Sequence, residues 1–231
     1  MDVYLHKLIT ISNRKLFGKI CSEIHLIGTN LDIPFINKEE NLKIDSKYSI
    51  NIKEIKSEID ILRKVAKTII FRNGEPFLQR IALKNLVQYA KQKGMYIAIE
   101  TYGTSPNLIK ELIDKKLVDM IILKAYFPLN ELWLQKICRS RLISNYKDII
   151  SQIKNTITIL ENSKINVQAK TCIVDGIIAN KNDVSKIINP LSKIRNLKYE
   201  IINLSNNINN DQIEEIKNHI TNKFKNIKIK D

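Results

Sequence analysis

Apolar residues in this chain gather in short runs of strand length, separated by longer stretches with helical spacing. Most of the runs are apolar throughout rather than alternating, which is typical of parallel strands that are covered by helices. Seven such runs are found, at residues 23–27, 68–71, 96–99, 120–123, 167–174, 199–202 and 227–229. The pattern therefore predicts a sheet that is mostly parallel.

The stretches between the runs place apolar residues three and four positions apart, as an amphipathic helix does. A helical pattern also runs from Leu78 to Ala90, directly after the second strand. Strand followed by helix, repeated, favours a parallel sheet with helices on its outer face, and an open or partial β/α barrel fits the pattern best. The helical positions include Ile52, Ile55, Ile59, Leu62 and Ala66, then Ile149, Ile153, Ile157 and Leu160, and finally Ile213, Ile216, Ile220 and Phe224.

Composition narrows the class of protein. The 231 residues are 44% hydrophobic, enough for a substantial core, and no stretch approaches the roughly 20 consecutive apolar residues of a membrane span. Residues 1–7 carry an acid and no long apolar segment, so they make a poor secretory signal. We expect one domain, residues 1–231, in the cytoplasm and without a membrane partner.

The formal net charge of +14 raises nucleic acid or another polyanion as a partner. The lysines are scattered along the sequence, however, and alternate with Glu and Asn along whole helices, as an AT-rich coding sequence would give. Two interpretations remain open: a solvated basic surface, or a site for a polyanion or an acidic partner.

Polar, glycine-containing segments follow most of the predicted strands. In a β/α barrel these segments meet on one face, where a glycine-lined cleft with basic and carboxylate groups is expected. Turns also favour Gly, Asn, Ser and Asp for local backbone reasons, so a purely structural role is the alternative. The segments are 28–30, 72–75, 100–104, Lys124, 175–176 and 203–207.

Four of these segments together resemble a known family. Residues 73–79, Asn-Gly-Glu-Pro-Phe-Leu-Gln, resemble the Gly-Gly-Glu-Pro motif of radical S-adenosylmethionine (radical SAM) enzymes, and residues 99–104 resemble their Glu-Thr-Asn-Gly-Thr strand end. Residues 119–128 and 170–176 are similar to later strands of glycyl-radical activating enzymes. The segments follow the family's order over nearly the whole chain. The resemblance is to the short activases of the anaerobic ribonucleotide reductase and pyruvate formate-lyase type.

The resemblance implies a fold and a ligand site. The fold is a partial (β/α)6 barrel of the radical-SAM type, α/β in class, with a mostly parallel sheet and outer helices. The family binds S-adenosylmethionine through the Gly-Gly-Glu-Pro turn and later strand ends. Three departures weaken the match: Asn73 replaces a glycine, Ile122 an aspartate and Asp175 a proline. The matching positions are Asn73, Gly74, Glu75, Pro76, Glu100, Thr101, Lys124 and Gly176.

The largest departure lies in the loop that holds the family's iron–sulfur cluster, here about residues 28–40. The family's three cysteines correspond to Thr29, Ile33 and Ile36, whereas Gly28, Asn30, Leu31, Pro34 and Asn37 match. Iron in such clusters is bound through thiolate sulfur, and isoleucine has no donor atom. A 4Fe–4S cluster is therefore not expected as a cofactor, nor is radical chemistry by the usual route.

Other catalytic sets are weak in the sequence. Cys21, Cys138 and Cys172 lie far apart and are expected to be buried apolar residues rather than a substitute metal site. His6, His25 and His219 are isolated, which favours structural roles. Glu75 and Glu100 follow neighbouring strands, and either act as an acid–base pair or pair with Arg72 or Lys124.

Three hypotheses for function follow. The first is a radical-SAM-fold protein without a cluster that serves as a binding or regulatory module, with an active paralogue, a glycyl-radical enzyme or a larger complex as its protein partner. The second is cluster-independent binding of S-adenosylmethionine or a nucleotide, for non-radical transfer chemistry or for sensing. The third is binding of RNA or another polyanion. Candidate interaction segments are 125–133, which holds three aromatic residues, and 33–36.

Overall fold

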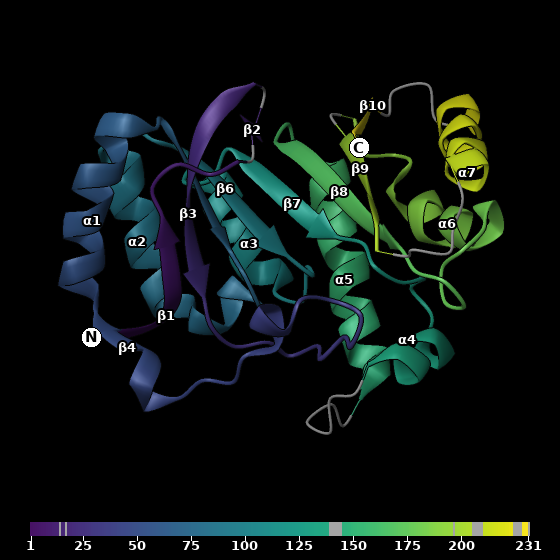
Figure 1. Cartoon of the computed structure of the whole chain (residues 1–231). Coiled ribbons are helices and arrows are strands. Elements are labelled where there is room, and N and C mark those ends of the chain that lie inside the picture. Colours follow the sequence, from purple (N-terminus) through teal and green to yellow (C-terminus); the bar gives the residue numbers. More distant parts are fainter. Residues whose placement is uncertain are drawn as a thin grey trace.

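The strands form one continuous sheet, with most of the helices against one of its faces (Figure 1). The computed structural model describes residues 1–13, 15–16, 18–138, 145–195, 197–204, 210–223 and 228–230. Across these residues the sheet has ten strands, in the order β10-β9-β8-β7-β6-β5-β3-β1-β4, with β2 paired to β3 beside this path. The strands are β1 (Asp2–Ile9), β2 (Lys15–Leu16), β3 (Lys19–Leu26), β4 (Ser49–Asn51), β5 (Thr68–Arg72), β6 (Tyr96–Thr101), β7 (Met120–Lys124), β8 (Asn166–Ile173), β9 (Leu197–Asn203) and β10 (Lys228–Lys230).

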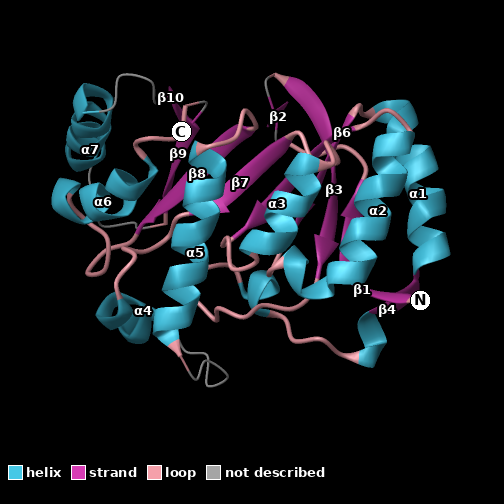
Figure 2. Cartoon of the chain, turned by 180° about the vertical axis from the view of Figure 1, so that it is seen from behind, coloured by secondary structure: helices cyan, strands magenta, loops and turns pink. Residues whose placement is uncertain are grey.

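The helices lie between successive strands of the parallel part. Figure 2 shows most of them in front of the sheet, where they cover its outer face. The α-helices are α1 (Ile52–Val65), α2 (Arg80–Gln92), α3 (Pro106–Asp114), α4 (Glu131–Ile137), α5 (Tyr146–Glu161), α6 (Lys181–Ile188) and α7 (Asn210–Lys223). Short 3-10 helices are η1 (Lys38–Asn41), η2 (Ser46–Tyr48), η3 (Pro76–Gln79) and η4 (Asn189–Leu191).

The strands from β3 through β5, β6, β7, β8 and β9 to β10 are all parallel to one another. The predicted fold class is confirmed: a mostly parallel sheet with outer helices, built from the predicted strands. The seventh predicted run starts at residue 227, which lies outside the described residues, as does Phe224 of the last predicted helix.

The antiparallel edge of the sheet was not anticipated. Strand β1 pairs antiparallel with both β3 and β4, and places the chain's first residues beside the first parallel strand. The helices α3, α4 and α6 are further additions, and each is short, which makes its periodicity difficult to read. No helix among the described residues is both long enough and apolar enough to cross a membrane.

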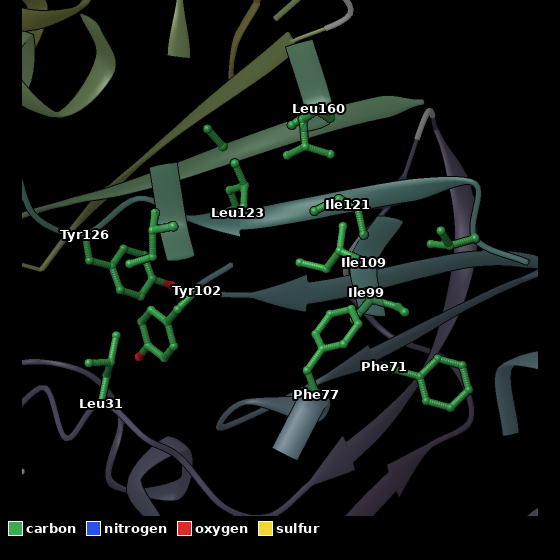
Figure 3. Packing of buried hydrophobic residues seen from close by; sticks show 14 of the residues in the cluster. Leu31, Phe71, Phe77, Ile99, Tyr102, Ile109, Ile121, Leu123, Tyr126 and Leu160 are labelled. Carbon is green, nitrogen blue, oxygen red and sulfur yellow. The ribbon is translucent and has the colours of Figure 1, made fainter. Parts of the chain in front are cut away.

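Alternate residues of each strand divide between two environments. Those on the outer face pack against the helices, and Figure 3 shows part of this core, with Ile99, Ile109 and Ile121 from β6, α3 and β7. The inner face has a smaller apolar layer near the start of the strands, which includes Ile70 and Met120. Farther along the same strands the inner positions are charged, and these positions form the candidate site.

Candidate functional site

The predicted site residues lie at the carboxyl ends of four neighbouring strands. The turn with Asn73, Gly74 and Glu75 follows β5, and Glu100 and Thr101 end β6. Lys124 is the last residue of β7, and the structure brings it to the β5 turn, where its ammonium group donates to the Gly74 carbonyl. Gly176 lies apart, exposed in a turn closed by the Val174–Ile178 bridge. Of the segment 203–207, residues 205–207 lie outside the described residues.

Glu75 is fully buried, and its carboxylate is enclosed by donors from its own chain. Thr101 Oγ1 donates to the two oxygens at 2.8 and 2.9 Å, and the backbone N–H of Tyr102 donates to Oε2 at 2.8 Å. The backbone N–H of Phe77 donates to Oε1 at 3.3 Å, so Glu75 also caps η3, which begins at Pro76. Burial raises the pKa of Glu75, although Lys124 and these donors oppose the rise. In this arrangement Glu75 joins β5 to β6.

The backbone around Gly74 explains why a glycine stands there. Gly74 has φ +50°, and a Cβ added to it would lie 2.1 Å from the Gly28 carbonyl oxygen. The next backbone N–H, that of Glu75, donates to the same oxygen at 2.7 Å. Only a residue without a side chain permits this approach of the two turns.

Asn73 has a role that the sequence did not indicate. Its φ is +72°, a conformation that Asn adopts more readily than most residues. Its buried amide group donates to the backbone oxygens of Leu26 at 3.1 Å and Glu39 at 2.8 Å. The side chain that stands in place of a glycine thus ties the β5 turn to the loop after β3.

That loop contributes a buried carboxylate to the site. Glu40, in η1, lies 3.3 Å from the Lys124 ammonium group and 3.6 Å from the Arg72 guanidinium group. Lys124 is itself buried and lies 3.8 Å from the centre of the Tyr102 ring. The loop therefore supplies an anionic partner to the cations at the ends of β5 and β7.

A second group of charged side chains lies on the inner face of the sheet, on β3, β5, β6 and β8. Arg72 is 3.1 Å from Glu23 and 3.4 Å from Glu100, and Lys170 of β8 is 2.5 Å from Glu100. His25 Nε2 is 2.6 Å from Glu23. Burial would raise the pKa of Glu23, but hydrogen bonds from His25 and Ser12 and the Arg72 charge lower it to about 2. Burial opposes the charged form of Arg72, and the surrounding carboxylates nevertheless raise its pKa.

Glu75 and Glu100, proposed from the sequence as one pair, have separate partners. Glu100 pairs with Arg72 and Lys170, whereas Glu75 is held by Thr101 and backbone N–H groups. These contacts favour the structural interpretation of both carboxylates. The sequence reasoning missed Glu23, Glu40 and Lys170 in this network. Glu23 and Lys170 had a signal, since each is a charged residue inside an apolar strand.

The loop after β3 fills the space where the resemblance places a metal cluster. Leu31 and Ile33 are fully buried and Ile36 nearly so, and all three belong to the main core. Thr29 Oγ1 donates to the Leu31 carbonyl at 2.9 Å and accepts from the Leu31 N–H at 3.1 Å. The residues present do not fit an iron–sulfur cluster, because two are hydrocarbon and the third is a hydroxyl engaged within its own turn.

The cysteines do not supply a substitute site. All three are buried thiols, as the sequence predicted. Cys21 starts the inner face of β3, and Cys172 lies on β8, four strand positions away, which corresponds to roughly 19 Å at about 4.8 Å per strand. Among the described residues, no group of three or more His, Cys, Asp or Glu is placed to hold a metal ion.

The expected interaction segments are also mostly inside the protein. In residues 125–133, Tyr126 and Phe127 are buried, Trp133 packs partly against the core, and Leu132 is 74% exposed. In residues 33–36 the isoleucines are buried. Neither segment forms the exposed aromatic or apolar patch that an interaction site would need.

An exposed apolar surface exists elsewhere, beside the β1–β4 edge. A hollow of about 430 Å³ is lined in part by Met1, Ile44, Leu78 and Ile81. All four side chains are exposed, and Ile81 is 71% exposed. Ile44 and Leu78 also lie against Gly28, so the hollow adjoins the start of the loop that fills the site. We call these four residues the edge hollow.

No protein-family model matches the chain. The chain is 29% identical over 194 residues, 81% of its length and 76% of the relative's, to a putative glycyl-radical enzyme activating enzyme of Methanocaldococcus jannaschii.

Solved structures share the fold at low sequence identity. A radical SAM methyltransferase from Sphaerobacter thermophilus has a TM-score of 0.68 at 11% identity, covering 99% of this chain and 76% of the methyltransferase. QueE from Escherichia coli has a TM-score of 0.55 at 12% identity, covering 99% of this chain and 92% of QueE. Sequence and fold together therefore confirm that this chain resembles the radical S-adenosylmethionine proteins of the short activating-enzyme type.

Proposed function

We propose that this chain is a non-catalytic protein of radical-SAM fold that acts by binding a protein partner. The observation that carries the proposal is the loop of residues 28–41, called the plug loop here. It buries apolar side chains where the cluster ligands would stand, and it supplies Glu40 to Lys124 and Arg72. The end of the barrel at which the family's chemistry takes place is thereby occupied by the protein itself.

Displacing the plug loop would be costly. Exposing a buried Leu or Ile side chain costs about 1.5–3 kcal/mol, and Leu31, Ile33 and Ile36 would be exposed together. Leaving Lys124 buried without Glu40 would add to this cost, because an unpaired buried charge is strongly unfavourable. A ligand would need to recover these losses before any net affinity appeared.

The alternative of cluster-independent S-adenosylmethionine or nucleotide binding is less well supported. Glu75 would have to give up the Thr101 and Tyr102 donors to receive an ammonium group from a ligand. The Gly74 carbonyl is likewise already an acceptor for Lys124. The groups that the resemblance assigns to the ligand are engaged with one another.

A protein partner is favoured by the named relative and by the surface. The relative is described as an enzyme that activates a glycyl-radical enzyme, so its partner is a protein. For this chain we propose a glycyl-radical enzyme, an active paralogue or a larger complex as the partner, and the edge hollow as the contact surface. Three free thiols fit a reducing compartment, and the proposal places the chain in the cytoplasm.

The test is anaerobic reconstitution with iron and sulfide, followed by desalting, iron analysis and calorimetric titration with S-adenosylmethionine. The Thr29→Cys, Ile33→Cys, Ile36→Cys triple variant restores the family spacing and serves as the matched sample. We expect wild-type protein to retain no iron and to give no saturable heat. Retention of about four iron atoms per wild-type chain, or saturable binding lost in Glu75→Ala, would overturn the proposal.

A further inference from the structure

The parallel topology gathers the lysines that are scattered along the sequence. Every helix that precedes a parallel strand ends near the amino end of that strand, so the turns that lead into the strands share one edge of the sheet. We call this edge the amino-end face. Figure 1 shows it on the side where β2 and the start of β3 lie.

Each turn that leads into β5, β6, β7, β8 or β9 carries at least one cation. The turns are residues 66–67, 93–95, 115–119, 162–165 and 192–195. These described residues include seven cations and one carboxylate, Asp119. Asp119 is itself held by Lys91 at 2.5 Å. The cations of the five turns are Lys67, Lys93, Lys115, Lys116, Lys164, Lys193 and Arg195.

The opposite edge has the contrary composition. The turns that leave the strands, residues 27–37, 73–75, 102–105, 125–130 and 174–180, hold no lysine or arginine among these described positions. They hold three carboxylates, Asp32, Glu75 and Asp175. Within these turns the cations therefore lie at the amino edge and the carboxylates mostly at the carboxyl edge, although Lys38 and Lys43 follow the first leaving turn in the same connection.

Local structure accounts for part of this asymmetry. Cations near helix carboxyl ends are favoured by the helix dipole, and Lys93 and Lys115 also pair with Asp60 and Glu111. For the exposed side chains of Lys67, Lys116, Lys193 and Arg195, no ion pair with a described residue is found. These four are spread over the turns into β5, β7 and β9. They form an exposed positive row for which the described residues provide no ion-pair partner.

We propose that the amino-end face binds the phosphate backbone of a double-stranded nucleic acid. From β5 to β9 the row crosses four strand spacings, or roughly 19 Å at about 4.8 Å each. Phosphates of one duplex strand follow each other about every 3.4 Å along the axis, so a row of this length spans about five or six of them.

A duplex is favoured over a single strand by the composition of the turns. Proteins that bind single strands stack bases on exposed aromatic side chains. The five turns contain no Phe, Tyr or Trp among their described residues, so they offer charge without a stacking platform. Contacts of this kind recognise backbone shape and charge rather than base sequence. The inference does not rest on the proposed function, because it concerns the opposite edge of the sheet.

The test is fluorescence anisotropy with a labelled 20-base-pair RNA duplex and the DNA duplex of the same sequence, between 50 and 300 mM salt. The face variant replaces Lys67, Lys116, Lys193 and Arg195 with Gln. The control variant replaces Lys38, Lys43, Lys53 and Lys147, which are exposed and outside the five turns, and therefore has the same net charge.

We expect the face variant to weaken duplex binding about tenfold or more and to reduce the salt slope by about three, whereas the control changes the affinity less than about threefold. Tighter binding of RNA than of DNA would mean that the face recognises the A-form duplex. Equal binding would mean that it accepts the backbone of either duplex. Equal weakening by both variants, or no saturable binding of either duplex at 50 mM salt, would overturn the proposal.

Discussion

Two buried carboxylates, Glu23 and Glu75, differ in the direction in which their surroundings shift the pKa. Glu23 is stabilised as an anion by His25, Ser12 and Arg72, and its pKa is lowered to about 2 although burial opposes this. Glu75 is surrounded by donors but is buried so completely that its pKa is raised. The two carboxylates therefore contribute to stability with opposite dependence on pH.

The variant Glu23→Gln tests the contribution of the Glu23 carboxylate to stability at low pH. The pKa of Glu23 in the folded protein lies below its ordinary value of 4.5, so its stabilising effect is present above about pH 4.5 and is lost as the pH falls toward 2. Between pH 5 and pH 3, the unfolding free energy measured with urea should fall by about 2 kcal/mol more in wild-type protein than in the variant. The control variant is Glu54→Gln, on α1. An equal loss of unfolding free energy in wild-type protein and in Glu23→Gln would contradict the stabilising role of the Glu23 carboxylate.

Gly74→Ala tests the close approach of the two turns. An added Cβ would lie 2.1 Å from the Gly28 carbonyl oxygen, so the β5 turn and the plug loop would have to separate. Gly94 provides a matched control, since its φ is also positive but nothing lies within 4 Å of an added Cβ. We expect Gly94→Ala to cost about 1 kcal/mol and Gly74→Ala more than about 3 kcal/mol in unfolding free energy. Similar costs would show that the turns are free to separate.

At the scale of the element, the plug loop behaves as part of the core although it has little regular structure. Its apolar residues lie within the same cluster as the strands and α1, and Asn41 Nδ2 donates to the Ile33 carbonyl at 3.0 Å. Asn73 and Gly28 attach the loop to the β5 turn through side-chain and backbone contacts. The loop should consequently resist opening until the sheet itself unfolds.

Ile33→Ala measures how firmly the loop is packed. Truncating a fully buried isoleucine should lower the unfolding free energy by about 2–5 kcal/mol, whereas Ile61→Ala on the exposed side of α1 should change it by less than about 0.5 kcal/mol. Hydrogen exchange of residues 28–41 should follow global unfolding in wild-type protein. Fast exchange there, with a small effect of Ile33→Ala, would show a loose loop and weaken the proposed function.

The elements differ in how well the sequence predicts them. The parallel strands were predictable because their outer positions are apolar without interruption, as in β5 and β7. Strand β1 was missed, since it lies near the antiparallel edge of the sheet and most of its residues are half-buried rather than continuously apolar. Contacts that depend on the folded chain were also out of reach: Glu40 meets Lys124 across 84 residues, and no local pattern indicates such a pair.

At the scale of the whole molecule, the two edges of the sheet differ: the plug loop covers one, and the other carries exposed cations. The carboxyl ends of the strands carry the plug loop and buried ion pairs, and the amino ends carry exposed cations. In the sequence the lysines are scattered, because consecutive turns are separated by a helix and a strand. Only the parallel topology brings these turns together, which is why the sequence did not locate a basic site.

The prediction that residues 1–231 form a single domain can be tested by asking whether the whole chain unfolds as one unit. Trp133, the only tryptophan, lies in α4 and packs against the core in the second half of the chain, far in sequence from Ile33. If the sheet unfolds as one cooperative unit, Ile33→Ala should shift the urea midpoint of Trp133 fluorescence and of the far-ultraviolet circular dichroism by the same amount. A fluorescence midpoint that stays at the wild-type value while the dichroism shifts would mean that β7 to β10 and their helices unfold separately, and the chain would then consist of two folding units.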